Sequence, residues 1–272
     1  MRALEASPPA TQGARVSSVA VPWDAVLSLV GRAEARARFP ELGFADPWAE
    51  AMLATLDVDP AGFDDRALRA STVRAMVVDG LVRHYFERNP DGLAIALNAG
   101  LCTRFSRVDN GRLRWVDLDP PHVAEFKCAH RLWQTSDRHA VARCCSIACT
   151  GWMDALQGAG DVPTLLIAEG ALERQPPELV DAFFTRVSAR LPKGTELIVD
   201  HEAHPPLRTP PRLRACLEVP AADGAVARYP RLRPIGEGEV TPALEQALRR
   251  VSRASRLLRG ARASSVLHLR FE

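Results

Sequence analysis

The most informative stretch of this 272-residue sequence is Ile95-Ala96-Leu97-Asn98-Ala99-Gly100-Leu101-Cys102-Thr103-Arg104, in which a short apolar run leads into a turn at Gly100. A glycine directly after a buried strand and before a helix lets the backbone approach a ligand closely and directs free N–H groups at it. In a doubly wound sheet, ligands bind beyond the carboxyl ends of the strands. On its own, Gly100 predicts only a ligand-binding turn, because any strand-to-helix turn can require one glycine.

Strands and helices alternate along the middle of the chain. Short, mostly uninterrupted apolar runs are typical of strands that are buried on both faces of a parallel sheet, and helical spacing separates them. The pattern therefore predicts an α/β protein with a doubly wound sheet. The expected strands are Leu93 to Leu97, Leu113 to Val116, Val141 to Cys145, Thr164 to Ala168 and Glu196 to Val199, and the helices between them cover about 121–131, 151–158 and 177–190.

The N-terminal third is expected to be helical. Residues 1–20 are rich in Ser, Ala, Pro and Gly and predict a disordered tail. Helices are predicted over Trp23 to Arg38 and from Asp46-Pro47, which together form a helical lid over 21–70. A longer helix is predicted from a cap at Ser71 to about Arg88.

The core is expected to cover 71–272 and to include an insertion around 205–234, where proline and arginine are frequent. A helix is predicted from about Pro242 to Leu258. The last segment, Ser265 to Phe271, alternates polar and apolar residues. This alternation predicts a strand with one solvated face, at the antiparallel edge of the sheet.

Composition limits the function classes. A formal net charge of +2 is too small to indicate a nucleic-acid partner, so a small-molecule substrate fits better. No apolar run reaches the roughly 18 residues of a membrane span, and Pro22, Trp23 and Asp24 interrupt the only apolar stretch near the N-terminus. A cytoplasmic protein without membrane contact is expected. The six cysteines show no paired CxxC spacing, and they predict reduced thiols and no metal site.

Acidic residues follow the next predicted strand. Trp115-Val116-Asp117-Leu118-Asp119 places two carboxylates at a strand end about twenty positions after the glycine turn. A carboxylate in this place accepts hydrogen bonds from both hydroxyls of a ribose, which favours a nucleoside-containing cofactor. The alternative is that Asp119, which precedes Pro120-Pro121, only caps the following helix.

Several motifs in this order resemble the leucine carboxyl methyltransferase and polyketide O-methyltransferase family. The resemblance covers about residues 66–204. It is carried by Arg74 with Asp79, Leu97-Asn98-Ala99-Gly100-Leu101-Cys102-Thr103-Arg104, Trp115-Val116-Asp117-Leu118-Asp119-Pro120-Pro121-His122-Val123 with Lys127, and Ala168-Glu169-Gly170.

The resemblance implies a Rossmann-like sheet of seven strands, S-adenosylmethionine as methyl donor, S-adenosylhomocysteine as product, and an oxygen acceptor, usually a carboxylate. By position, Arg74 would pair with the carboxylate of the cofactor's methionine part, and Glu169 would close the pocket. A guanidinium binds a carboxylate through two hydrogen bonds, and a carboxylate beside a sulfonium cation is electrostatically favourable. The other implied cofactor-binding residues are Asn98, Ala99 and Gly100 for methionine and ribose, Asp117 or Asp119 with Leu118 for ribose, and Ser146 with Ile147 for adenine.

Three positions depart from the family pattern. Cys102 stands where an aspartate is usual, Ser146-Ile147 where Asp-Leu is usual, and Arg174 where a tyrosine is common. These departures support a second hypothesis, a degenerate methyltransferase fold that binds a metabolite or partner without transferring methyl. A nicotinamide oxidoreductase is disfavoured, because the turn contains only Gly100 in place of three glycines.

The acceptor is expected to be a carboxylate, or less favourably a phenol or enol hydroxyl, of a specialised metabolite. A carboxylate needs no general base, whereas a hydroxyl would be helped by one, and His201 and His204 are the candidates. The alternative is that both are solvated loop residues, as His122, His130 and His139 are expected to be surface groups. Arg174 could clamp an anionic acceptor. A basic stripe is either a solvated face or a docking site for an acidic carrier protein or peptide; it consists of Arg250, Arg253, Arg256, Arg259 and Arg262.

Overall fold

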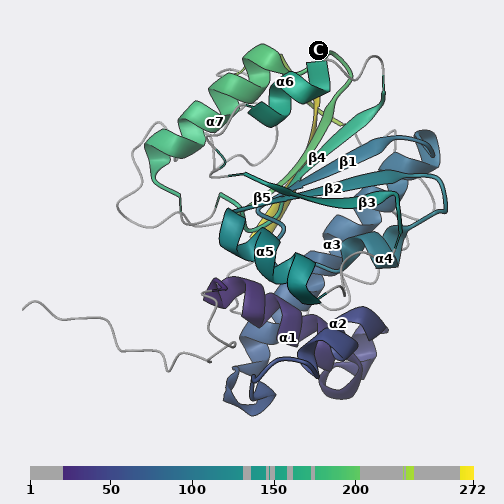
Figure 1. The fold of residues 1–272 in the computed structure, drawn as a ribbon, viewed down its shortest axis with the longest axis vertical. Coiled ribbons are helices and arrows are strands. Elements are labelled where there is room, and N and C mark those ends of the chain that lie inside the picture. Colours follow the sequence, from purple (N-terminus) through teal and green to yellow (C-terminus); the bar gives the residue numbers. More distant parts are fainter. Residues whose placement is uncertain are drawn as a thin grey trace, which may run out of the picture.

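The computed structural model describes residues 21–130, 136–144, 147, 151–157, 162–172, 175–202, 229, 231–235 and 264–272 (Figure 1). Several expectations lie outside these residues. They are the tail over 1–20, most of the insertion around 205–234, the helix from Pro242 to Leu258 and the basic stripe within and after it.

The described strands form one seven-stranded sheet in the order β3-β2-β1-β4-β5-β7-β6. The first five strands run parallel, and β7 runs antiparallel to both β5 and β6. The predicted doubly wound, Rossmann-like α/β fold is therefore confirmed. The bounds of β1 and β4 are as predicted, and those of β2, β3 and β5 differ by a few residues. The strands are β1 (Leu93–Leu97), β2 (Arg114–Asp119), β3 (His139–Arg143), β4 (Thr164–Ala168), β5 (Glu196–Glu202), β6 (Leu232–Pro234) and β7 (Ser264–Phe271).

The last strand differs from its prediction in two ways. Strand β7 is antiparallel as expected, but β6 lies outside it, so β7 is not at the edge of the described sheet. Its polar face is also only partly solvated. The His268 side chain is 8% exposed and lies against the carboxylate of Glu196, because helix α3 (Asp65–Arg88) contacts this face of the strand.

Helices cover both faces of the sheet. Alternate residues of a strand point to opposite faces. Ala94 and Ala96 of β1 therefore pack toward α3 and α4, whereas Ile95 and Leu97 pack in the core that includes α6 and α7. The helices are α1 (Trp23–Arg38), α2 (Pro47–Leu53), α3, α4 (Arg104–Val108), α5 (Pro121–His130), α6 (Gly151–Gln157) and α7 (Pro177–Arg190), with short 3₁₀ turns at Pro40–Leu42 and Pro60–Gly62.

The N-terminal helices form a third apolar cluster beside the sheet. Leu29 and Val30 of α1 pack with Met52 of α2, and Leu101 and Phe126 join this cluster from the sheet side. In Figure 1, α1 and α2 lie together at one end of the molecule, below α5 and the strands. The predicted bounds of α1 are confirmed, and Asp46 caps α2 as expected by accepting a hydrogen bond from the Ala49 N–H at 3.0 Å.

Helix α3 begins earlier than predicted. Its cap is Asp64, whose carboxylate accepts a hydrogen bond from the Ala67 N–H at 3.0 Å. The predicted cap at Ser71 is wrong: this residue is buried inside the helix, and its hydroxyl donates to Ser28 Oγ on α1 at 3.0 Å. The expected domain boundary at residue 70 therefore falls within α3.

None of the helices in the described ranges has both the length and the apolar composition needed to cross a bilayer.

Candidate functional site

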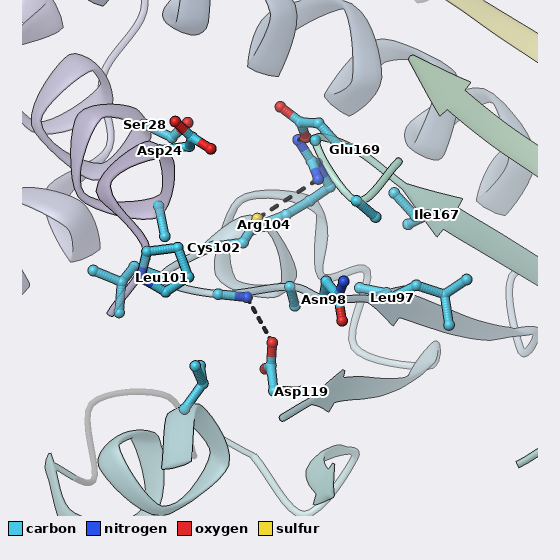
Figure 2. Close-up of a pocket in the computed structure, with 18 of the residues that line it drawn as sticks. Asp24, Ser28, Leu97, Asn98, Leu101, Cys102, Arg104, Asp119, Ile167 and Glu169 are labelled. Carbon is cyan, nitrogen blue, oxygen red and sulfur yellow. Dashed lines mark hydrogen bonds and ion pairs between the residues drawn. The ribbon is translucent and has the colours of Figure 1, made fainter. Parts of the chain in front are cut away.

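A cavity of about 340 Å³ opens at the carboxyl ends of β1, β2 and β4 (Figure 2). Strand β1 lies between β2 and β4, which is the point where the strand order reverses and where ligands bind in doubly wound sheets. The volume falls within the range of small-molecule sites. The cavity brings together residues predicted from four separate segments: Arg74, Asn98, Ala99, Gly100, Asp119 and Glu169.

The turn after β1 has a left-handed backbone at two positions. Asn98 has a φ of 49° and Gly100 a φ of 55°, a region that glycine occupies at least cost. The N–H of Gly100 donates to Asp119 Oδ1 at 2.7 Å, and the N–H of Asn98 donates to the Leu118 carbonyl at 2.8 Å. The end of β2 therefore holds the glycine turn in place at the cavity wall (Figure 2).

Asp117 and Asp119 have different surroundings. Asp119 lines the cavity, whereas Asp117 is buried beneath it and is not among the lining residues. Lys127 Nζ joins them, at 2.8 Å from Asp117 Oδ2 and 2.7 Å from Asp119 Oδ2. Trp115 Nε1 and His139 Nε2 also contact Asp117, at 2.8 and 3.0 Å. Of the two carboxylates, Asp119 is therefore the one at the cavity surface.

The pKa values of these two carboxylates are shifted in opposite directions. Burial raises the pKa of Asp119 above its ordinary value, and the nearby Lys127 ammonium only partly offsets this. Burial also acts to raise the pKa of Asp117, but Lys127 and His139 outweigh it and hold that pKa well below its ordinary value. The expectation that His139 is a surface group is wrong, because its side chain is 4% exposed and stacks on the Phe105 ring.

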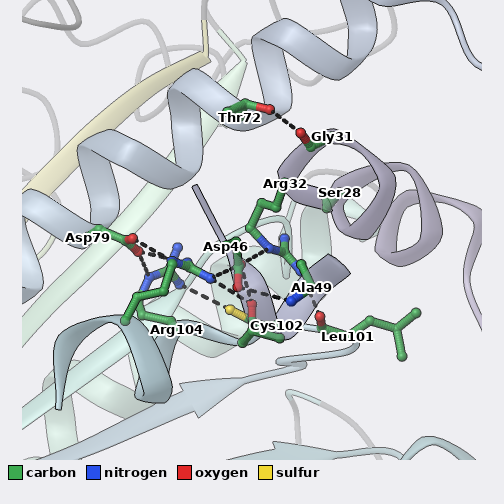
Figure 3. Close-up of polar contacts among 12 residues, drawn as sticks. Ser28, Gly31, Arg32, Asp46, Ala49, Thr72, Asp79, Leu101, Cys102 and Arg104 are labelled. Carbon is green, nitrogen blue, oxygen red and sulfur yellow. Dashed lines mark hydrogen bonds and ion pairs between the residues drawn. The ribbon is translucent and has the colours of Figure 1, made fainter. Parts of the chain in front are cut away.

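A chain of alternating charges runs beside the cavity, and Figure 3 shows the part of it that contains Arg104, Asp79, Asp46 and Arg32. The whole chain connects the end of β5 with α1 through α3, α4, the turn after β4 and the residue that caps α2. In order, its members are Asp200, Arg74, Glu169, Arg104, Asp79, Arg107, Asp46 and Arg32. Each charge therefore has an opposite charge beside it, which burial of ions requires.

Arg104 lies near the middle of this chain and is almost fully buried. Its Nε donates to Asp79 Oδ1 at 2.6 Å, and its Nη2 donates to Glu169. Burial acts to raise the pKa of Glu169, but Arg104 and Arg74 outweigh it and lower that pKa below its ordinary value. Glu169 is therefore an anion at neutral pH, and it lines the cavity beside Arg74.

Cys102 occupies the position where the related motif has an aspartate. Its thiol is half-buried, lines the cavity and accepts a hydrogen bond from Arg104 Nη1 at 3.6 Å. The cavity therefore presents a thiol at this position, and Arg104 pairs with Asp79 and Glu169. Two other implied binding residues, Leu118 and Ile147, pack in the apolar core beneath the cavity.

The structure describes no side chain of the candidate acceptor residues and none of Ser146. His204, Arg174 and Ser146 lie outside the described residues. His201 belongs to β5, where its backbone pairs with Ser265, and its side chain is outside the described part of the chain.

Helix α1 supplies a wall of the cavity that the sequence reasoning missed. Asp24, Ser28 and Arg32 all line it, and their spacing of four places them on one side of the helix. Figure 2 shows the first two. Arg32 Nη2 donates to the Leu101 carbonyl at 2.6 Å and so reaches the glycine turn. This polar stripe opposite the apolar face of α1 was the signal in the sequence that could have revealed the wall.

Within the described ranges, no group of three or more His, Cys, Asp or Glu side chains is arranged to hold a metal ion.

Comparison with known proteins found relatives for part of the chain. A "Putative S-adenosyl-L-methionine-dependent methyltransferase" of Mycolicibacterium gilvum (strain PYR-GCK) is 30% identical over 155 residues, which cover 53% of this chain and 50% of that protein. A protein of the same name from Mycobacterium ulcerans (strain Agy99) is 29% identical over 203 residues and covers 65% of each chain. This chain thus spans about half to two thirds of the length of these relatives. No family model matches it.

Solved structures of methyltransferases are similar at lower identity. Magnesium protoporphyrin IX methyltransferase from Synechocystis PCC 6803 is 11% identical with a TM-score of 0.43, covering 89% of this chain and 98% of that one. Mitomycin 7-O-methyltransferase is 15% identical with a TM-score of 0.40, covering 92% of this chain and 68% of that one. The chain is thus related in sequence to proteins named as S-adenosylmethionine-dependent methyltransferases, and its sheet has the seven-stranded, Rossmann-like order expected of the class I enzymes.

Proposed function

We propose that this protein is an S-adenosylmethionine-dependent O-methyltransferase that acts on a carboxylate, or on a phenol or enol hydroxyl, of a small specialised metabolite. One observation carries the proposal. Arg74, Gly100, Asp119 and Glu169 come from four separate segments of the chain and line the same cavity.

The described residues fit the cofactor's chemistry. Asp119 lies at the end of β2, where a carboxylate can accept hydrogen bonds from ribose hydroxyls. The left-handed turn at Gly100 lets the backbone approach closely without a side chain in the way. Arg74 would pair with the methionine carboxylate, and the anionic Glu169 favours the cationic part of the cofactor. When bound, S-adenosylmethionine supplies a methyl group that its sulfonium has already activated.

The protein's contribution to such a transfer is position and exclusion of water. In-line displacement at an activated carbon requires the acceptor oxygen to be aligned with the donor, and alignment accounts for much of the rate. Helix α1 contributes Asp24, Ser28 and Arg32 to the cavity wall. In this proposal, the helix keeps water away from the reacting groups. A carboxylate acceptor needs no base. A hydroxyl acceptor would use His201 or His204, and Arg174 would bind an anionic acceptor.

Calorimetry with S-adenosylmethionine and with S-adenosylhomocysteine tests the proposal. Both ligands are expected to bind, and Arg74→Ala is expected to weaken both at least about tenfold, because it removes a charge-assisted pair. The matched control is Arg66→Ala, an exposed arginine of the same helix, which is expected to leave both affinities unchanged. Absence of binding by the wild-type protein would overturn the proposal.

Product detection separates an enzyme from a protein that only binds. Wild-type protein incubated with S-adenosylmethionine and a set of metabolite carboxylic acids is expected to yield a methyl ester, detected by mass spectrometry, and Arg74→Ala is expected to abolish it. Binding of both cofactors without methylated product from carboxylic acids or phenols would favour the second reading, a methyltransferase fold without transfer. The proposal includes an acidic carrier protein or peptide that presents the acceptor. Adding this carrier is then expected to lower the acceptor concentration that methylation requires.

A further inference from the structure

Two glycine turns at the cavity are held in the same way. The N–H of Gly100 donates to Asp119 Oδ1 at 2.7 Å, and the N–H of Gly170 donates to Asp200 Oδ1 at 2.8 Å. Both glycines have a left-handed backbone, with φ of 55° and 65°, and both line the cavity. In each case, the carboxylate comes from the strand next to the one that leads into the turn: β2 beside β1, and β5 beside β4.

Asp200 also contacts the cavity arginine. Its Oδ2 lies 3.2 Å from Arg74 Nη1, and its side chain is fully buried. The Nε of Arg74 lies 3.5 Å from Glu169 Oε1, and Glu169 directly precedes the turn glycine, Gly170. Asp200 therefore fixes Arg74 through one oxygen and the turn that carries Glu169 through the other.

A buried carboxylate in this position has a functional consequence. A long arginine side chain has many rotamers, so a free guanidinium loses affinity when a ligand must order it. Asp200 holds that guanidinium beside Glu169 before any ligand arrives. Arg74 lies beside Glu169, and Figure 2 shows Glu169 and Asp119 on opposite sides of the glycine turn.

We propose that Asp200 is a positioning residue for the amino-acid end of the cofactor, while Asp119 serves the nucleoside end. The two Asp–Gly pairs then divide the cofactor between them: one orients the ribose, and the other orients Arg74 and Glu169 toward the carboxylate and amine. This inference rests on the proposed function and adds Asp200, which no sequence motif indicated.

The test compares two ligands that share a nucleoside. S-adenosylhomocysteine carries both ends, and 5′-methylthioadenosine lacks the amino-acid end. Asp200→Asn keeps an oxygen that can accept the Gly170 N–H but removes the charge beside Arg74. It is expected to weaken S-adenosylhomocysteine about tenfold in calorimetry and to change the affinity for 5′-methylthioadenosine less than about twofold. Asp119→Asn, the matched variant at the other turn, is expected to weaken both ligands.

The outcomes separate this inference from the proposed function. If the wild-type protein binds neither ligand, the proposed function fails. If it binds both and Asp200→Asn weakens them equally, or weakens neither, the positioning role is overturned while the cofactor site stands. Thermal unfolding of each variant checks its fold. Should Asp200→Asn not fold, Asp200→Glu makes the same comparison, because it keeps a carboxylate but displaces it from Arg74 Nη1 and the Gly170 N–H; equal loss of both ligands would again contradict the role.

Discussion

Gly100 is the residue at which backbone geometry and ligand binding coincide. An alanine there would adopt a left-handed φ at a cost of about 1–2 kcal/mol. Its methyl group would also lie 3.1 Å from Ala25 Cβ on α1, so the wall or the turn must move. Gly100→Ala is therefore expected to lower the free energy of unfolding and to weaken S-adenosylhomocysteine binding at least about tenfold. Urea unfolding and calorimetry measure the two effects.

Gly43 provides the control for this substitution. It ends the 3₁₀ turn at Pro40–Leu42 with a φ of 58°, and an added methyl group would meet nothing within 4 Å. Gly43→Ala is expected to cost a similar backbone free energy and to leave ligand affinity unchanged. If both variants bind the ligand as tightly as wild type, the Gly100 turn does not contact it.

The residues of the cavity were only partly predictable. Arg74, Gly100 and Glu169 could be found because their motifs occur in a characteristic order along the chain. Asp117 and Asp119 could not be distinguished, because residues two apart on a strand point to the same face. The difference arises from their other contacts: Trp115 and His139 bind Asp117, whereas Asp119 accepts the Gly100 N–H and lines the cavity. Asp200 was missed because its partners are far away in sequence.

At the scale of elements, helix α1 is joined to the glycine turn by Arg32. This buried side chain donates to the Leu101 carbonyl, and its Nε lies 3.3 Å from Asp46 Oδ2. Arg32→Ala would leave a buried carbonyl without this donor and a buried carboxylate with one cation fewer. We expect a loss of roughly 3 kcal/mol in the free energy of unfolding and weaker cofactor binding, measured by urea unfolding and calorimetry.

Arg36 is one turn further along α1 and forms an exposed ion pair, whereas the ion pair of Arg32 is buried. The Arg36 side chain is 63% exposed and pairs with Glu50 at 2.7 Å. Because exposed ion pairs contribute about 0–1 kcal/mol, Arg36→Ala is expected to change stability slightly and affinity not at all. Equal effects of the two substitutions would show that α1 does not depend on the buried contact.

Strands were predicted well where the local sequence pattern matched the burial of their two faces in the structure. The parallel strands are short apolar runs because both of their faces are covered, and β1 and β4 were predicted with the bounds that the structure has. Strand β7 alternates polar and apolar residues, yet its polar face is partly covered by α3. His268 and Arg270 on this face interact with Glu196 of β5. An alternating pattern cannot distinguish a solvated face from one that carries a buried ion cluster.

Across the whole molecule, charges connect elements that the sequence keeps apart. The chain from Asp200 to Arg32 spans α1, α3, α4 and the ends of β4 and β5, and four of its members line the cavity. A second cluster at Glu196 joins α3 to β5 and β7. Arg88 and Glu196 lie 108 residues apart, and Arg74 and Asp200 lie further apart still, so no local periodicity could have paired them.

The Glu196 cluster makes stability depend on pH. Arg88 of α3 donates to both oxygens at 3.0 and 2.9 Å, His268 Nε2 lies 2.7 Å away, and Arg270 Nη2 lies 3.0 Å away. Burial acts to raise the pKa of Glu196, but His268 and Arg88 outweigh it and lower the pKa from 4.5 to about 2. His84, which faces His268 edge-on, has its own pKa lowered by burial and then by Arg88.

The sign of the dependence follows from this shift. A carboxylate whose pKa is lower in the folded state stabilises the fold at pH values above its unfolded pKa, and this contribution is lost as pH falls through the folded pKa. The melting temperature of the wild-type protein is therefore expected to fall steeply between about pH 5 and pH 2. Glu196→Gln should lower stability at pH 7 by on the order of 3 kcal/mol and should flatten this slope, because the titrating group is gone. The exposed Glu178→Gln on α7 is the control and should reproduce the wild-type curve. A Glu196→Gln curve parallel to that of wild type would mean that other groups, His84 among them, determine the acid sensitivity.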